Sequence, residues 1–241
     1  MPSPNMPHLL NFPIENRILA ALPRAELNRL LPDLAPVRLP QGKVLWDADD
    51  HIRHAFFLMG GMVSLLSFTE EGACVEVGMI GSEGLAGIFS ILRFDAAPYR
   101  VVVQLPTAAM RIRVDALRRE FARDGRLQDL LLRYTYTLLT QVSQSASCNR
   151  FHTAEERLCR WLLTSGDHAK SDTFPLTQEF LAQMIGAPRT SVTTVASKLQ
   201  RMGLIRYRRG RIRVLDRRGL ETFSCECYRV ISEGLSRYLA A

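Results

Sequence analysis

The sequence has no uninterrupted apolar stretch of the roughly 18 residues that a membrane-spanning helix needs. This absence is informative because 47% of the 241 residues are hydrophobic, which is enough for one large or two ordinary domains with real cores. The first residues also lack the basic start and the long apolar run of a secretory signal peptide. We therefore expect a cytoplasmic protein that has no membrane partner.

Cysteine is scarce and irregularly spaced. An odd number of scattered cysteines argues against a disulfide framework. Cys225 and Cys227 are separated by one residue, and no third or fourth ligand lies near them in the sequence, so no zinc site is expected there. The pattern predicts buried or reduced thiols, with a redox-sensing cysteine as the alternative. The five cysteines are Cys74, Cys148, Cys159, Cys225 and Cys227.

Motifs of catalysis are missing as well. The sequence contains no nucleophile elbow, no phosphate-binding loop and no His/carboxylate spacing typical of a metalloenzyme. His51 and His54, in the segment DADDHIRH, are expected to be exposed to solvent rather than bound to a metal. We therefore predict no enzyme activity, no catalytic residue and no metal site.

Short strands with glycine punctuation are present between about Val37 and Val114. Turns every eight to twelve residues suggest a compact β barrel or roll. Helical spacing of apolar residues precedes this region from Glu15 to Leu31, and a short helix is expected to begin at Asp115. The fold class is therefore predicted to be α+β.

A long helix is predicted from about Leu127 to about Ser147, followed by a second helix from Thr153 to Leu163. Thr153 and Glu156 fit a capping box at the start of that second helix. In the long helix, apolar side chains recur close to a heptad rhythm, which favours a parallel homodimer seam over a helix packed only on its own β domain. The predicted seam residues are Leu127, Leu131, Tyr134, Leu138 and Val142.

The segment from Leu176 to Leu215 has the layout of a winged helix-turn-helix. Two short amphipathic helices are joined by a turn at Gly186, which can take positive φ, and Pro188 suits the start of the second helix. A basic hairpin around Arg209-Gly210 follows, with apolar and basic residues in alternation. The residues expected to contact double-stranded DNA are Thr177, Arg189, Thr190, Ser191, Thr193, Thr194, Ser197, Lys198, Arg201, Arg208, Arg209 and Arg211.

Charge is concentrated on the same part of the chain. Between residues 150 and 220 there are 14 Lys and Arg against 6 Asp and Glu, a balance of +8, whereas the remaining residues carry −1 of the net +7. A basic excess on a helix-turn-helix is expected of a surface that neutralises phosphates and releases counterions. A row of arginines on a solvated face is the alternative for any single arginine.

Taken together, the helical start, the β roll, the long helix and the C-terminal winged helix-turn-helix resemble the cyclic-AMP-receptor/Fnr (Crp/Fnr) family of bacterial transcription regulators. The similarity covers nearly the whole chain. It is carried most specifically by GKVLW (42–46), FFLMGGMVSLL (56–66), EERLCRWLL (155–163) and the helix-turn-helix. The resemblance implies a homodimer whose two recognition helices enter successive major grooves, with RNA polymerase as an expected partner.

Two departures from the family are visible. The family pairs Gly-Glu with the ribose and Arg-Ser or Arg-Thr with the phosphate of a cyclic nucleotide. Here Gly87 is followed by Ile88, Glu83 lies off register, and Arg100, after Tyr99, is followed by Val101. Losing the carboxylate removes a charge-assisted hydrogen bond worth roughly 1.5–3 kcal/mol, so we predict that cyclic AMP is not the ligand. The candidate effector residues are Glu83, Gly87, Ile88, Tyr99 and Arg100, with Arg100 as an anion contact or, alternatively, a surface charge.

The second departure is in the recognition helix, where Thr190 and Thr194 stand at positions that carry glutamate and arginine in many family members. Arg189 matches the first arginine and could pair with guanine, so we expect a preferred DNA sequence different from the best-known sites. No cysteine occurs before Cys74, which argues against the iron–sulfur branch of the family. No cofactor is therefore predicted, although a small-molecule effector is left open.

The sequence thus predicts an effector-sensing β-roll domain (1–125), a dimerisation helix (126–150) and a winged helix-turn-helix domain (151–241). The predicted function is a homodimeric, sequence-specific DNA-binding transcription regulator that does not depend on cyclic AMP. The alternative is a nucleotide-binding regulatory protein that acts through protein–protein contacts.

Overall fold

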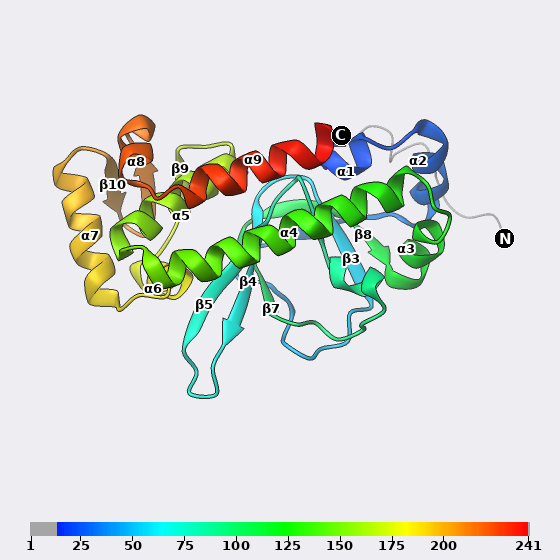
Figure 1. The fold of residues 1–241 in the computed structure, drawn as a ribbon, viewed down its shortest axis with the longest axis horizontal. Coiled ribbons are helices and arrows are strands. Elements are labelled where there is room, and N and C mark those ends of the chain that lie inside the picture. Colours follow the sequence, from blue (N-terminus) through cyan, green and yellow to red (C-terminus); the bar gives the residue numbers. More distant parts are fainter. Residues whose placement is uncertain (1–13, 241) are drawn as a thin grey trace.

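The computed structural model describes residues 14–240 of the chain, which begin with three short helical segments (Figure 1). These are α1 (Arg17–Ala20), α2 (Arg24–Leu30) and the 3₁₀ turn η2 (Leu31–Asp33). The predicted helical spacing is present, but Pro23 interrupts the helix and stands at the N-cap of α2. Asn16 caps α1, and its side-chain amide donates hydrogen bonds to the carbonyls of Leu58 and Gly84. This start of the described chain is thereby fixed to the β region.

The predicted β roll is confirmed as two antiparallel four-stranded sheets. One has the order β1-β8-β3-β6 and the other β2-β7-β4-β5. A 3₁₀ segment, η3 (Ile88–Leu92), follows β6. The strands are β1 (Ala35–Leu39), β2 (Val44–Trp46), β3 (His54–Leu58), β4 (Met62–Phe68), β5 (Cys74–Ile80), β6 (Leu85–Ala86), β7 (Arg100–Leu105) and β8 (Thr107–Arg113).

Three helices follow the roll: α3 (Val114–Phe121), α4 (Arg126–Phe151) and α5 (Ala154–Ala169). The long helix exists as predicted and extends a further turn beyond Ser147. The capping box is confirmed, because the Thr153 hydroxyl accepts from the Glu156 N–H while the Glu156 carboxylate accepts from the Thr153 N–H. It separates α4 from α5 at a sharp bend after His152.

The C-terminal part contains the predicted helix pair and hairpin, with three further elements that the sequence did not reveal. The predicted ones are α6 (Gln178–Ile185), α7 (Arg189–Arg201), β10 (Ile205–Arg208) and β11 (Arg211–Val214). The further ones are β9 (Thr173–Pro175), which pairs with β11, and the helices α8 (Arg217–Phe223) and α9 (Cys227–Ala240). Figure 1 shows α9 running back along α4, away from the helix-turn-helix at one end of the molecule.

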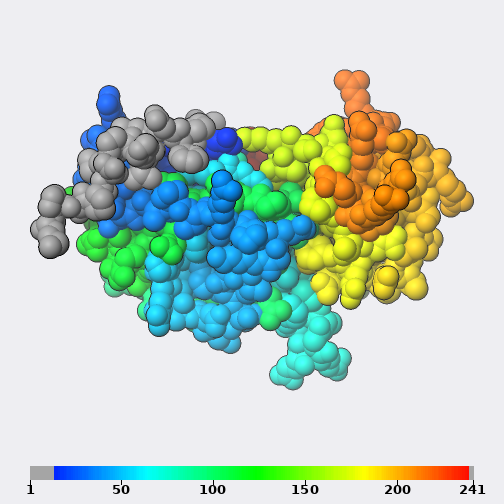
Figure 2. All heavy atoms as spheres, turned by 180° about the vertical axis from the view of Figure 1, so that it is seen from behind, coloured from blue at the N-terminus to red at the C-terminus, as the bar shows by residue number. Residues whose placement is uncertain are grey.

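Two hydrophobic cores hold the molecule together. The first lies inside the roll and extends to the N-terminal half of α4. The second joins α5, the helix-turn-helix and its hairpin to side chains of the sheet, among them Met62, Leu66 and Met79. In Figure 2 the yellow and orange helix-turn-helix is accordingly packed directly against the roll. No helix among residues 14–240 is both long enough and apolar enough to cross a bilayer.

Candidate nucleic-acid interface

The turn between α6 and α7 depends on Gly186. Thr177 caps α6 by accepting from the Phe180 N–H at 3.2 Å, and the helix ends at Gly186 with φ of 58°. A Cβ atom at this position would lie 2.9 Å from the Cγ2 of Val75 on β5, so both the conformation and the space favour glycine. The turn therefore positions α7 against the rest of the domain.

One face of α7 is buried and the other is exposed, as the periodicity predicts. Val192 and Leu199 are fully buried and Ala196 nearly so, because this face packs on α5 and α6. Ser191 is half-buried at the edge between the two faces. The exposed residues of α7 are Arg189, Thr190, Thr193, Thr194, Ser197, Lys198 and Arg201.

The threonines of this exposed face are anchored to their own helix. The Thr193 hydroxyl donates to the Arg189 carbonyl at 2.9 Å and the Thr194 hydroxyl to the Thr190 carbonyl at 3.0 Å. Their remaining lone pairs and methyl groups stay available to a base edge. The side-chain oxygen of Gln178 lies 3.1 Å from the Thr193 hydroxyl. This contact adds a side-chain amide from α6 to the exposed face. The prediction omits Gln178, since its proximity to Thr193 is created by the turn.

Lys198 differs from the other basic residues of α7. Its ammonium lies 2.7 Å from the carboxylate of Glu155 on α5 and 5.8 Å from the ring centre of Phe223. Its charge is therefore partly neutralised within the domain. Arg189 and Arg201 are exposed, and neither has an acidic partner at ion-pair distance in the part of the chain that the structure describes.

The hairpin presents arginines on one face and apolar residues on the other. Ile205, Ile212 and Val214 are buried, while Arg206 stands opposite Arg213 in the antiparallel register. Arg209 and Gly210 form the turn with φ of 50° and 70°, which suits the tight two-residue turns of hairpins. A shallow surface hollow lies on the basic face. It is lined by Thr173, Arg206, Arg208, Arg209, Arg211, Ile212 and Arg213.

Arg206 and Arg213 are absent from the predicted contact residues, although the alternation along the hairpin places them on the same face as Arg208 and Arg211. Among residues 14–240, none of these arginines forms an ion pair with a carboxylate, so the neighbouring like charges of this face repel one another. A polyanion would relieve that repulsion, because it supplies the missing charge of opposite sign.

The predicted effector residues do not converge on one cavity. Glu83 is 5% exposed, and its carboxylate lies 3.4 Å from Nδ1 of His168 on α5. Burial would raise the pKa of Glu83, but the charge and hydrogen bond of His168 outweigh it and hold that pKa below its usual value. The pKa of His168, which burial would lower, is raised by the same pairing. Glu83 therefore joins the roll to the DNA-binding half of the chain.

The other candidate effector residues have separate partners within the roll. Gly87 has φ of 93°, and a Cβ there would lie 3.2 Å from Ala55 and 3.3 Å from the ring of Trp46. Ile88 is fully buried in the core. The aromatic ring of Trp46 thus occupies the space beside Gly87.

Arg100 is the first residue of β7, and Tyr99 directly precedes it. Tyr99 packs edge-on against Phe89, with ring centres 5.9 Å apart. The Arg100 guanidinium pairs with Asp47 and lies 4.8 Å from the centre of the Phe68 ring. Of the two alternatives for Arg100, its partly exposed side chain and its carboxylate partner match the surface charge.

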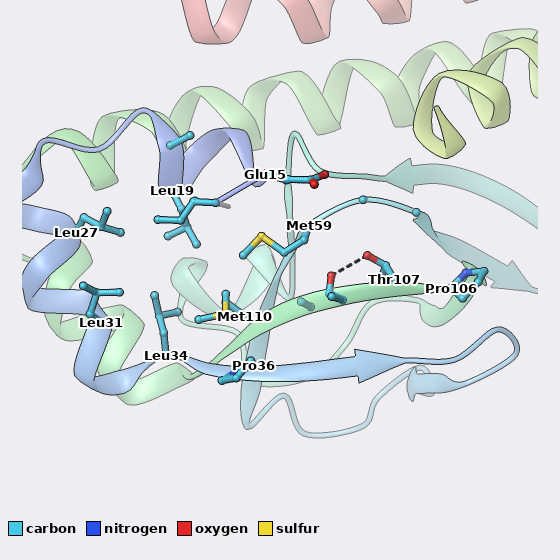
Figure 3. Close-up of a pocket in the computed structure, with 16 residues that line it drawn as sticks. Glu15, Leu19, Leu27, Leu31, Leu34, Pro36, Met59, Pro106, Thr107 and Met110 are labelled. Atoms are coloured by element: carbon cyan, nitrogen blue, oxygen red, sulfur yellow. Dashed lines mark hydrogen bonds between the residues drawn. The ribbon is translucent and has the colours of Figure 1, made fainter. Parts of the chain in front are cut away.

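A larger cavity of about 790 Å³ lies outside the roll, between the N-terminal helices and the sheet that contains β1 and β8 (Figure 3). Its lining is mostly apolar and includes Leu19, Leu31, Met59 and Met110. None of the five predicted effector residues is among the residues that line it.

The predicted dimer seam is corrected by the structure. Leu127, Leu131 and Tyr134 are 0–1% exposed and Leu138 is 4% exposed, because they pack in the core of their own chain. Val142 is half-buried beside Gly78 on β5. These four buried side chains of the heptad rhythm therefore pack on the roll of their own chain. The apolar side chains that α4 exposes are instead Leu132, Tyr136, Leu139 and Phe151.

A second polar contact links the roll to α5. The Trp161 indole donates to the buried carboxylate of Glu76 at 3.0 Å. Burial raises the pKa of Glu76 to about 7, against the opposing effects of hydrogen bonds and of the charge on Arg160. The interface between the two halves therefore contains two titratable contacts, at Glu76 and at Glu83.

Comparison with known families identifies two domains in this chain. Residues 36–124 match the cyclic nucleotide-binding domain, and residues 156–223 match the Crp-like helix-turn-helix domain. The first matched range covers the β roll from Pro36 onward, and the second contains the α6–α7 pair with its hairpin. No curated protein matches the chain.

Solved structures share the fold at low identity. FixK2 from Bradyrhizobium japonicum superposes with a TM-score of 0.68 at 14% identity, over 80% of this chain and 98% of its own. A putative transcriptional regulator of the Crp/Fnr family from Eubacterium rectale gives 0.67 at 15%, over 86% and 96%. The c-di-GMP-responsive global regulator CLP from Xanthomonas campestris gives 0.63 at 18%, over 80% and 100%.

Proposed function

The chain belongs to the Crp/Fnr family of transcription regulators and carries a helix-turn-helix DNA-binding domain, and we propose that it works as a homodimeric, sequence-specific DNA-binding regulator. The observation that carries this proposal is the cationic surface formed by α7 and the hairpin, whose arginines have no internal carboxylate partners among residues 14–240. Double-stranded DNA, a second copy of the chain and RNA polymerase are the proposed partners, and the cytoplasm is the proposed location.

Roles within this surface follow from position. Arg189, in the first turn of α7, is proposed to bind guanine O6 and N7 bidentately, with Thr190 and Thr194 contacting neighbouring base edges. Thr177, Ser191, Arg201 and the hairpin arginines are proposed to contact phosphates, which orient the protein without reading sequence. Thr193 and Ser197 lie on the exposed face of α7, between the residues proposed to contact bases and those proposed to contact phosphates. Lys198 is proposed to pair mainly with Glu155, because its ammonium lies 2.7 Å from that carboxylate.

The test compares two arginines on the same surface. The reference duplex is an operator that the wild-type chain selects from a pool of random duplexes. Arg189→Ala should reduce the discrimination between this operator and a scrambled duplex by about 1–3 kcal/mol, while weak, salt-sensitive binding remains. Arg209→Ala should weaken binding to both duplexes about equally and reduce the salt slope by about one. Titrations of both variants on both duplexes at several salt concentrations supply the measurement. An equal loss on both duplexes for Arg189→Ala would refute its base-reading role.

The dimer is proposed to form through the exposed stripe of α4. Leu132, Tyr136 and Leu139 are 48%, 74% and 63% exposed and are spaced by four and three residues, as in a two-helix seam. Such a stripe of large apolar side chains is costly to leave in water, and a two-fold partner would cover it. We further propose functional units at 1–125, 126–150 and 151–241, of which residues 1–13 and 241 lie outside the described structure.

Cyclic AMP is proposed not to be the effector. The ring of Trp46 beside Gly87, the side chain of Ile88 and the outward pairing of Arg100 with Asp47 remove the space and the groups that a cyclic nucleotide needs. Titration calorimetry of the purified chain with cyclic AMP and cyclic GMP should therefore give no saturable heat. Micromolar binding of either would favour the alternative, a nucleotide-binding regulatory protein acting through protein contacts.

A further inference from the structure

Four potential metal ligands from two distant parts of the sequence meet where α4 ends. Cys148 is in the last turn of α4 and His152 directly follows that helix, while Cys225 and Cys227 flank the start of α9. Their ligand atoms all lie within 4.8 Å of one another. This corrects the expectation that no further ligand accompanies Cys225 and Cys227. We propose that these four residues form a Cys₃His site for one zinc ion.

The distances suit a single tetrahedral ion. Cys148 Sγ and Cys225 Sγ are 3.6 Å apart, and Cys227 Sγ lies 3.5 Å from His152 Nδ1. Zinc bonds of about 2.3 Å to sulfur and about 2.0–2.1 Å to nitrogen give ligand separations of about 3.8 Å and about 3.5 Å in a tetrahedron. Cys148 and Cys225 are free thiols in this structure, since the sulfurs of a disulfide are only about 2.05 Å apart. Their close grouping fits one ion better than a multi-iron cluster.

Burial also separates this cluster from an ordinary group of core cysteines. Cys148 and Cys227 are fully buried and Cys225 is 6% exposed, and the three thiols form a small cluster of their own, apart from the two apolar cores. Thiolate and imidazole ligands in a closed, four-coordinate set are typical of structural zinc. The set leaves no ligand position for water, so the site is structural rather than catalytic.

The surroundings orient and stabilise the ligands. The His152 Nε2 atom lies 3.3 Å from the Glu226 carboxylate, so Nδ1 is the nitrogen that faces the sulfurs. The Gln144 amide donates to Cys227 Sγ at 3.1 Å, which favours a thiolate. Three thiolates and Zn²⁺ carry one net negative charge. Arg160 supplies a positive charge that acts on Cys148. This arginine is 4% exposed, and its Nε atom has no hydrogen-bond partner among the described residues.

A zinc ion bound at this site would connect the long helix α4 to the C-terminal helix α9. The matched helix-turn-helix domain ends at residue 223, so Cys225, Cys227 and α9 lie beyond it. Zinc bound here would tie the end of the DNA-binding domain to the last turn of α4 and hold α9 along that helix. This inference does not rest on the DNA-binding proposal.

The experiment begins with metal analysis of the full-length chain purified under reducing, anaerobic conditions. We expect about one zinc per chain, retained in Cys74→Ser, whose half-buried thiol lies outside the cluster, and lost in the double variant Cys225→Ser/Cys227→Ser. Glu226→Gln keeps all four ligands and should weaken zinc binding about 10–100-fold in competition with a chelator. That variant separates an effect on the ligand set from a loss of folding.

Cobalt gives a second readout on the unmodified chain, in case the double variant fails to fold. Stoichiometric Co²⁺ uptake should produce the intense visible bands of tetrahedral cobalt together with thiolate-to-metal charge transfer. The proposal is overturned if the wild-type chain holds no zinc and shows no saturable cobalt site. It is also overturned by a Cys148–Cys225 disulfide in the purified chain, by bound iron with acid-labile sulfide, or by equal cobalt binding in a folded double variant.

Discussion

At the residue scale, the buried pair of Glu83 and His168 makes stability depend on pH. His168 has a raised pKa, so its contribution is complete below its unfolded value of 6.5 and is lost as the pH rises through the folded value. Glu83 has a lowered pKa, so its contribution is present above 4.5 and is lost as the pH falls through its folded value. The pair therefore stabilises the fold most between these two unfolded values. Asp167 and Glu76 also raise the pKa of His168.

We expect the free energy of unfolding to fall between about pH 6 and about pH 9, and His168→Gln to reduce that fall. Removing one partner of a buried pair should itself cost about 3–5 kcal/mol near pH 6. Urea denaturation at both pH values measures the effect. Glu76→Gln is the control, because Glu76 also has a raised pKa and its ionisation acts in the same direction. A pH profile unchanged by His168→Gln would contradict the assignment.

At the element scale, two adjacent leucines of α4 should have different effects. Leu138 is 4% exposed in the core of the chain, whereas Leu139 is 63% exposed on the proposed seam. Leu138→Ala should destabilise the fold by about 2–5 kcal/mol, because it leaves a cavity. Leu139→Glu should leave the fold intact and shift the chain from dimer to monomer by placing like charges opposite each other. Light scattering and urea denaturation distinguish the two. A Leu139→Glu chain that stays dimeric would exclude this seam.

At the scale of the whole molecule, the roll and the DNA-binding half share a hydrophobic core and should unfold together. Met62, Leu66 and Met79 of the roll lie in the same cluster as Trp161 of α5. Each half contains one of the two tryptophans, Trp46 and Trp161, so the variants Trp161→Phe and Trp46→Phe report on the halves separately. We expect a single cooperative urea transition in each variant, so that the tryptophan left in either half reports the unfolding of the whole described chain. Two separated transitions with an intermediate would show that the shared core does not couple them.

Local patterns predicted most of this architecture. Apolar spacing located the helices, alternation around Arg209-Gly210 located the hairpin, and the Thr153 and Glu156 pair marked the start of α5, because each depends on residues that are neighbours in the sequence. The same locality explains the exposed arginines of α7, since helical period alone separates them from Val192 and Leu199. The turn chemistry of Gly186 was equally readable, because positive φ is a property of one residue.

Contacts between distant segments required the tertiary structure. A heptad rhythm shows that α4 has an apolar face, but it cannot say whether a second chain or the roll of the same chain covers that face. Likewise, Glu83 meets His168, and Cys148 meets Cys225 at a sequence separation of 77, only because α5 and α9 pack back on earlier elements. Periodicity defines which side chains share a surface, whereas the partner of that surface is chosen by the packing of the entire chain.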